Sequence, residues 1–447
     1  ALPSTGGVPY LMFRPSTRFA AAGRSQSNSS RSVAAPPVSS THGTSVFIHI
    51  KGWHWSDGTQ ITARDVQFWQ NLVTANKDNW AGYVPGEYPD NVLSTTINPA
   101  HPLQITFHLS HAYGSSFFTY NELSQITPLP QHLWDKESSS GAVGAYDETP
   151  AGAVKVFDFL DDQSKCISPN HTHPLGQVGA GQWKLKASVA AGNVQMVPNP
   201  GSCGPVKPTL TQFNEVPYAQ ATAEVNDLKS ASSVSNTKID FGYIPEQDVP
   251  QKSSLGNIYH FSAWPYWEIN YAAENFTNPT SGPIFGQLYF RQAMQDLVDQ
   301  KTLISTAFSG FAIPTYGPVP IEPSSNFVDA QEKINRYPYS PSTATPLLQA
   351  TGWTVNAGGT SVCSSPGTGT GQCGAGIPMG AKASFTLQYV SGSPPLDQEM
   401  TELKADFALA GIAINVSKAP LDTVRGNAIP CTPCAACTWH CAFWGSG

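Results

Sequence analysis

The sequence predicts an α/β protein with mixed sheets, divided into two or three domains. Strand-like and helix-like segments alternate from about residue 200 onward, which is typical of this class. The chain has 447 residues, more than one ordinary core accommodates. Hydrophobic residues make up 40% of it, enough for sizeable cores and too many for wholesale disorder.

Charge and hydropathy exclude two classes of partner. The formal net charge is −7 and only 12% of the residues are charged. No basic stripe is visible, so the sequence does not indicate a nucleic-acid-binding protein. No apolar run reaches the length of about 18 residues that a membrane-spanning helix needs.

The first half of the chain predicts strands around one well-defined helix. "SVFIHI" at 45–50 has the β-branched and aromatic content of a strand, and 103–110 alternates as a strand does. The segment 62–75 predicts a helix with Thr62 as N-cap and an apolar face. Two strands joined through Ala-Gly-Asn are expected within 182–200.

The second half predicts helices and strands in alternation. Strands are expected at 238–245, 266–274, 384–390 and 412–420, and helices at 220–231, 288–308 and 396–411. The helix at 288–308 has the clearest apolar periodicity. The Gly-rich stretch 355–382 predicts a surface excursion, which a disulfide between Cys363 and Cys373 would hold.

The even number of cysteines, most of them in loop-like sequence, favours disulfides and an oxidising compartment. The eight are Cys166, Cys203, Cys363, Cys373, Cys431, Cys434, Cys437 and Cys441.

Other motifs do not predict an enzyme or a cofactor. The run Gly369-x-Gly371-x-x-Gly374 fits a dinucleotide-binding pattern, but it lies in low-complexity sequence with no strand before it. His171 and His173 lie in a Pro-rich loop, where solvated histidines are commoner than metal ligands. Gly-x-Ser-x-Gly and His-Glu-x-x-His are absent. We therefore expect no catalytic residue, no metal and no cofactor.

One stretch, with others in the same order after it, resembles a known family. "WHWSDGTQITARDVQFWQNLV" (53–73) is followed by "FFTYNELSQITPLPQHLW", "GAGQWKLK…VQMVPNP", "IDFGYIP", "YWEINYAAENFTNPT…LYFRQAMQDLVDQKTLI", "AFSGFAIPTYGPVP" and "TPLLQATGW". This series resembles family 5 extracellular solute-binding proteins, the oligopeptide- and dipeptide-binding components of ABC importers. It covers about residues 10–445. Gln300 departs from the pattern, where an Arg is usual, and both ends of the family pattern are missing, so we expect a longer natural protein.

The resemblance implies a periplasmic-binding-protein-like fold of class II, with two lobes, a hinge and an inserted third domain. Residues 1–15 and 131–265 would form the first lobe, 16–130 the inserted domain, and 266–447 the second lobe. Such proteins close on a ligand like a hinged trap.

The resemblance also implies an extracellular or periplasmic protein, lipid-anchored at the cell surface and monomeric. It would capture oligopeptides for the membrane subunits of an ABC importer and catalyse nothing. The residues expected to touch ligand are Trp80, Tyr83, Trp264, Tyr266, Trp267, Asn270, Arg425, Trp439, Trp444 and Gly445, with Arg425 facing a ligand carboxylate. Two alternatives stay open: another solute, such as an oligosaccharide or a metal chelate, and a secreted metal or redox protein.

The second alternative rests on "CTPCAACTWHC" (431–441), whose spacing is that of iron–sulfur ligands. Ala442 follows where Pro is usual, no second run exists, and thiolate clusters do not persist outside the cell. We therefore expect two local disulfides, Cys431–Cys437 and Cys434–Cys441, among the three connectivities that four cysteines allow.

Overall fold

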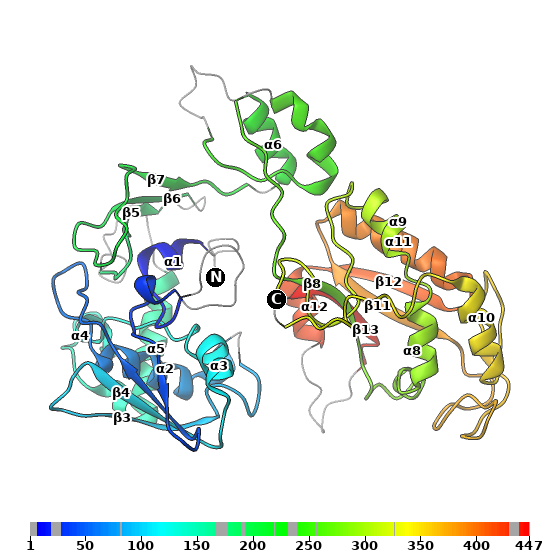
Figure 1. The fold of residues 1–447 in the computed structure, drawn as a ribbon, viewed down its shortest axis with the longest axis horizontal. Coiled ribbons are helices and arrows are strands. Elements are labelled where there is room, and N and C mark those ends of the chain that lie inside the picture. Colours follow the sequence, from blue (N-terminus) through cyan, green and yellow to red (C-terminus); the bar gives the residue numbers. More distant parts are fainter. Residues whose placement is uncertain are drawn as a thin grey trace. The chain divides into compact units, whose positions relative to one another are not determined.

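The computed structural model describes residues 7–18, 28–80, 83–165, 178–188, 193–218, 220–230, 239–255, 258–325, 327–428 and 438–446. The chain divides into two compact units, Ala1–Pro217 and Tyr218–Gly447, coloured blue to green and green to red in Figure 1. Among the described residues, no helix is both long enough and apolar enough to cross a membrane. The division into three domains remains a prediction.

The first unit contains two antiparallel sheets, ordered β1-β2-β4-β3 and β5-β6-β7. Its elements are α1 (Gly7–Met12), η1 (Ser29–Arg31), β1 (Val38–Ser39), β2 (Ser45–His49), α2 (Ala63–Ala75), η2 (Lys77–Asn79), β3 (Val92–Ile97), β4 (Gln104–Leu109), α3 (Ser115–Phe117), η3 (Phe118–Glu122), α4 (Gln131–Trp134), η4 (Tyr146–Glu148), α5 (Pro150–Lys165), β5 (Trp183–Ser188), β6 (Val194–Pro198) and β7 (Phe213–Glu215).

Helix α2 begins where the sequence predicts. Thr62 is its N-cap, and the Asp65 carboxylate accepts a hydrogen bond from the backbone N–H of Thr62 at 2.8 Å, completing a capping box. The other Asp65 oxygen accepts from the N–H of Gln131 at 3.1 Å, which fastens α2 to α4. Arg64, the residue before Asp65 in α2, forms an ion pair with the fully buried carboxylate of Asp147 in η4.

The second unit is built on a four-stranded mixed sheet, ordered β12-β11-β13-β8, and also contains the two-stranded sheet β10-β9. Its elements are α6 (Ala221–Ser230), η6 (Glu246–Leu255), β8 (Ile269–Glu274), α7 (Gly282–Phe285), α8 (Leu288–Gln295), α9 (Gln300–Thr306), α10 (Pro341–Ala350), β9 (Trp353–Thr354), β10 (Val362–Cys363), β11 (Ser384–Val390), α11 (Pro394–Ala408), β12 (Ala413–Ala419), α12 (Leu421–Ala428) and β13 (Cys441–Ser446).

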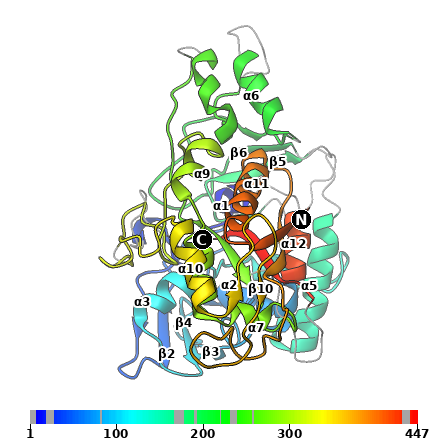
Figure 2. The ribbon, with the colours of Figure 1, turned by 90° about the vertical axis from the view of Figure 1, so that its right-hand side faces the viewer.

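Strand β11 is the middle of this sheet and the centre of its core. It pairs in parallel with β12 and with β13, while β13 pairs antiparallel with β8. Alternate residues Phe385, Leu387 and Tyr389 are buried in one cluster with α7, α8, α10 and α11. Figure 2 shows α10, α11 and α12 from the side of this unit. The predicted mixed α/β class is confirmed.

The predicted helix at 288–308 is interrupted, which corrects the sequence-based expectation. Helix α8 ends at Gln295, and α9 begins at Gln300. The cause is Asp299, whose carboxylate accepts hydrogen bonds from the backbone N–H of Thr302 at 3.0 Å and from its hydroxyl at 2.6 Å. An aspartate that caps a new helix competes with continuing the old one.

The strand predicted at 238–245 does not form over its described residues, 239–245. Phe241 is 71% exposed and Tyr243 is 63% exposed, so neither ring packs on a core. The N–H of Tyr243 donates to the Glu224 carboxylate in α6, and the carbonyl of Ile239 accepts from the Tyr259 hydroxyl. Side chains therefore take the hydrogen bonds that a neighbouring strand would provide.

The cysteines follow the expectation in part. Cys363 and Cys373 form a disulfide, as expected for the Gly-rich excursion. Both cysteines are fully buried, so the disulfide anchors the Gly-rich stretch 355–382 to the core of the second unit. The stretch does not lie only on the surface. Cys166, Cys431, Cys434 and Cys437 lie outside the described residues.

The expectation that all the cysteines pair is wrong for Cys203 and Cys441, which are free thiols. Cys441 begins β13 opposite Glu274 of β8, and this register turns its thiol into the core cluster of the second unit. The predicted Cys434–Cys441 disulfide is therefore not formed. Burial, with the Glu274 carboxylate nearby, raises the pKa of the Cys441 thiol, which disfavours the thiolate that a metal cluster needs.

Candidate ligand-binding site

Strand β8 lies at one end of the sheet of the second unit and carries the candidate site. Its neighbour among the described strands is β13, so its other edge has no strand partner there. Side chains alternate along a strand, so Ile269 and Tyr271 lie on one face. Trp267, two residues before Ile269, continues this row.

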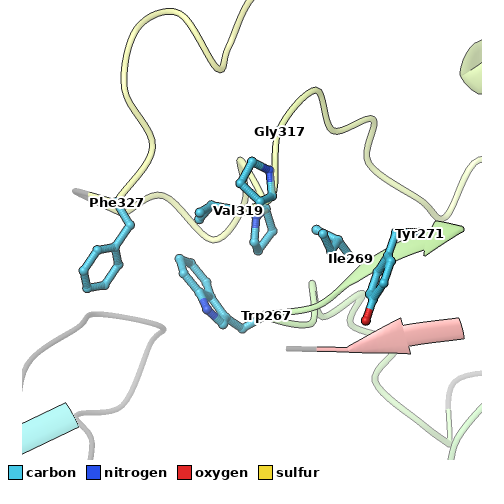
Figure 3. Close-up of a pocket in the computed structure, with 8 residues that line it drawn as sticks. Trp267, Ile269, Tyr271, Gly317, Val319 and Phe327 are labelled. Atoms are coloured by element: carbon cyan, nitrogen blue, oxygen red, sulfur yellow. The ribbon is translucent and has the colours of Figure 1, made fainter. Parts of the chain in front are cut away.

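A pocket of about 830 Å³ lies beside this row of side chains, entirely within the second unit. Its lining residues are Trp267, Ile269, Tyr271, Gly317, Pro318, Val319, Pro320 and Phe327. Figure 3 shows the Trp267 indole extending from the start of β8 toward Val319, with Phe327 on its far side. The size is typical of a small-molecule or peptide side-chain site.

The loop that forms the upper wall of the pocket is fastened to α9 by one amide side chain. Gln300 accepts a hydrogen bond from the N–H of Thr315 at 3.0 Å and donates one to the Thr315 carbonyl at 2.9 Å. The Thr315 hydroxyl then donates to the carbonyl of Val319 at 3.3 Å. This chain of bonds fixes the backbone from 315 to 319, which contributes Gly317 and Val319 to the lining.

Strand β13 supports the site from the other side of β8. Trp444 pairs with Tyr271 in the register, and the two ring centroids lie 5.5 Å apart. Gly445 lies opposite Asn270, and a Cβ at this position would come within 2.6 Å of the Asn270 Oδ1. Only glycine fits here without displacing the side chains of Asn270 and Glu268.

The start of β13 is held by two buried asparagines that follow β8. The Nδ2 groups of Asn275 and Asn278 donate to the Trp439 carbonyl at 2.8 and 3.0 Å. Trp439 is itself half-buried, and its indole N–H has no hydrogen-bond partner among the described residues. These bonds fix where β13 begins and so the register that places Trp444 beside Tyr271.

None of the described residues that line the pocket has a charged side chain. At its border, burial and the Tyr243, Glu268 and Glu246 side chains raise the pKa of Tyr266, so this phenol stays neutral at physiological pH. The lining can therefore bind apolar or neutral groups by contact, while hydrogen bonding is left to the edge of β8.

Comparison with known proteins agrees with this architecture. Residues 32–429 match the family described as bacterial extracellular solute-binding proteins, family 5 Middle. The chain belongs to this family. The family 5 chain is 22% identical over 399 residues to protein XP55 of Streptomyces lividans, a match that covers 88% of this chain and 59% of that protein. It thus spans about three fifths of the length of this curated relative.

Two solved structures share the fold of this family 5 protein. The oligopeptide-binding protein AppA of Bacillus subtilis, in complex with a nonapeptide, has a TM-score of 0.68 at 18% identity, covering 98% of this chain and 74% of AppA. NikA of Brucella suis, in complex with Fe(III)-EDTA, has a TM-score of 0.67 at 16% identity, covering 98% of this chain and 74% of NikA. At such identities the likeness extends to the fold, which matches the predicted periplasmic-binding-protein-like architecture.

The structure places five of the residues predicted from sequence at or near the pocket. Trp267 lines it, Asn270, Trp444 and Gly445 lie on the two paired strands, and Tyr266 precedes Trp267. Trp264, earlier in the same segment, is 82% exposed and is not part of the lining.

The other predicted residues lie elsewhere. Trp80 packs against Trp69 and Tyr88 in the first unit, with ring centroids 6.2 and 5.7 Å away. Tyr83 donates to Asp90 at 2.8 Å in the same unit. Arg425 is exposed on α12, and no ion pair links it to another described residue. Whether these residues touch ligand remains a prediction.

Sequence analysis missed most of the lining. Ile269 and Tyr271 follow from the alternation of the predicted strand once Trp267 is assigned to the site. Gly317, Val319 and Phe327 lie in or beyond the family-like segment "AFSGFAIPTYGPVP". That segment carried the resemblance, but its Pro-rich composition gave no sign of which strand it would contact.

Proposed function

We propose that this family 5 chain is the solute-binding component of an ABC importer and that it captures oligopeptides. The observation that carries the proposal is the unpartnered edge of β8 beside an uncharged, largely apolar pocket in the described part of the second unit. AppA, which has the same fold, holds a nonapeptide.

The chemistry of this arrangement suits a peptide of varied sequence. An extended peptide can pair with the free edge of β8 through its main chain, which is common to all peptides. Every second side chain would then enter the pocket formed by Trp267, Tyr271 and the loop at 317–320. Neutral walls with room for water accept different side chains, so affinity does not require one sequence. Binding of this kind involves no bond-making step, and the protein acts as a receptor.

The remaining parts of the proposal follow from the family. The protein would act outside the cell as a lipid-anchored monomer and deliver peptide to the membrane subunits of the importer. Because NikA holds Fe(III)-EDTA in the same fold, an anionic chelate is the main competing ligand class. The redox alternative is weakened by the buried, protonated thiol of Cys441.

Calorimetric titration with peptides tests the proposal. A random peptide library is first offered to the purified protein, and native mass spectrometry selects a retained peptide for titration. We expect Trp267→Ala to weaken binding of that peptide by about 1–3 kcal/mol, the range for an aromatic residue in a binding site. The indole is 38% exposed, so the melting temperature should change little.

Trp264→Ala is the matched control, because it removes an indole that is 82% exposed and lies outside the lining. It should bind the peptide with nearly wild-type affinity. Retention of no peptide, or equal affinities of wild type and Trp267→Ala, would contradict the proposed site.

A further inference from the structure

The beginning of the chain has an unbalanced positive charge. The first acidic residue is Asp57, and the residues before it include Arg14, Arg18, Arg24, Arg31 and Lys51. The chain as a whole carries a net charge of −7. These cations are therefore concentrated in a segment that supplies no carboxylate of its own.

The fold gathers the described cations of this segment in the first unit. The N–H groups of Val33 and Ala34 donate to the carbonyls of Pro15 and Ser16, so the segments around Arg14 and Arg31 lie side by side. The Lys51 ammonium donates to the carbonyl of Ser32 at 2.9 Å and also to that of Ser29.

Trp53 joins Lys51 to Arg14. The Lys51 ammonium lies 5.4 Å from the centroid of the Trp53 ring, and the Arg14 guanidinium lies 5.2 Å from it. We call Arg14, Arg18, Arg31, Lys51 and Trp53 the cationic cluster.

Arg14 is the least compensated member of the cluster. It is only 3% exposed, and its Nε donates to the Ala180 carbonyl at 3.2 Å. Among the described residues no hydrogen bond or ion pair is found for Nη1 and Nη2, which are not fully shut off from solvent. A Cβ on Gly204 would lie 3.3 Å from both nitrogens, so the Gly204 backbone covers the guanidinium without pairing with it.

The remaining members do not compensate Arg14. Burial and the mutual repulsion of Arg14, Arg18 and Arg31 lower the pKa values of Arg14 and Arg18. The nearby Cys203 thiol accepts a hydrogen bond from the backbone N–H of His54 at 3.3 Å. Burying a guanidinium is costly while part of its donor fork has no protein acceptor, and an anion with two oxygen atoms can satisfy Nη1 and Nη2 together.

We propose that the cationic cluster of the first unit is an anion-binding site for a small oxyanion, a carboxylate or a phosphate group. Arg14 supplies the buried charge, and the more accessible Arg18, Arg31 and Lys51 supply the rim. The site uses no residue of the pocket beside β8, so the inference does not rest on the proposed function.

Calorimetric titration of the full chain with sodium phosphate and, separately, with sodium acetate tests the inference at constant ionic strength. Saturable binding of at least one anion is expected. Stronger binding of phosphate would indicate a phosphate-bearing ligand, and stronger binding of acetate a carboxylate-bearing one. Either Arg31→Gln or Lys51→Gln should raise the Kd at least about tenfold, since each removes a charge-assisted contact.

Lys404→Gln is the matched control, because it removes an exposed charge from α11 in the second unit. It should bind the anion as wild type does. Bound anion should also raise the melting midpoint of the first unit by about 3–6 °C for each tenfold rise in concentration above the Kd. The control separates this shift from the general stabilising effect of phosphate salts.

Arg31 is exposed and Lys51 bonds to backbone carbonyls, so Arg31→Gln decides the question if Lys51→Gln fails to fold. The inference is overturned if neither anion binds saturably, or if Arg31→Gln and Lys404→Gln bind it with the same affinity.

Discussion

Gln300 shows how one residue can position a site that it does not touch. The family pattern has an Arg where this chain has Gln300, and an amide can both donate to and accept from one backbone unit, whereas a guanidinium only donates. Its two hydrogen bonds to Thr315 hold the loop that lines the pocket. We expect Gln300→Ala to weaken peptide binding by about 1–2 kcal/mol, because the loop must then be ordered by the ligand.

The measurement is calorimetric titration with the peptide selected against wild type. If Gln300 acts by positioning the loop, Gln300→Ala should bind the peptide with a more unfavourable entropy. Gln300→Asn should recover part of the affinity if its shorter amide still reaches Thr315. Gln398→Ala removes an exposed amide from α11 and should leave the affinity unchanged. Equal affinities of the Gln300→Ala and Gln398→Ala proteins would show that the hydrogen bonds between Gln300 and Thr315 do not contribute to binding.

The family resemblance indicated part of the site. It pointed to Trp267, and the structure puts Trp267 in the pocket. The same resemblance selected Trp80, which packs against Trp69 and Tyr88 in the first unit. Local sequence does not distinguish these two environments, because burial of an indole depends on which distant segments arrive beside it.

Helix α11 carries a buried ionisable residue, Glu399, which makes the stability of the second unit depend on pH. Glu399 is 8% exposed, and one of its carboxylate oxygens has no hydrogen-bond partner in the described part of the chain. Burial, with Glu402 nearby, raises the pKa of Glu399 from 4.5 to about 7. The folded protein thus holds this proton more tightly than the unfolded chain. Its free energy of unfolding must fall as the pH rises from about 4.5 to about 7.

We therefore expect Glu399→Gln to stabilise the second unit above about pH 7 by about 2–3 kcal/mol and to have little effect near pH 4.5. Urea unfolding of wild type and variant at the two pH values measures this difference. Glu322→Gln removes an exposed glutamate from the same unit and should show no such pH-dependent gain. A gain that is the same at both pH values would mean that Glu399 acts through packing rather than through its charge.

Elements with strong local signals were predictable, and those decided by partners were not. Thr62 and Asp65 specify the start of α2, and β11 matches its predicted bounds because its alternation continues from Ser384 to Val390. The segment 238–245 has strand composition, but its described residues, 239–245, pair with no described strand. Asp299 divides the helix expected at 288–308, because a local cap overrides a continuous apolar pattern.

At the scale of the whole chain, the net charge conceals an uneven distribution of charged residues along the sequence. The composition gives a net charge of −7 and no visible basic stripe, yet no acidic residue precedes Asp57. The family resemblance gave the fold correctly. The domain division that it implies remains a prediction, and Val178, expected in the first lobe, packs in one cluster with Val33 and Ile126 of the expected inserted domain.

The two units have separate cores, which predicts how the molecule unfolds. Residues 284–443 contain one core cluster, and the clusters of residues 12–196 all belong to the first unit. Domains with their own cores unfold as separate cooperative steps when little else couples them. We expect differential scanning calorimetry of the full chain to show two transitions.

The Cys363–Cys373 disulfide identifies which transition belongs to the second unit. It closes a short loop, with a sequence separation of 10, and should contribute roughly 2–3 kcal/mol. Replacing both cysteines by Ala should therefore lower one transition by about 5–10 °C and leave the other in place. Cys203→Ala, which removes a free thiol from the first unit, is the matched control for losing a cysteine side chain.

A single transition that moves as a whole would mean that the units unfold together. In that case the anion and the peptide should also stabilise the same transition, whereas independent units require each ligand to shift a different one.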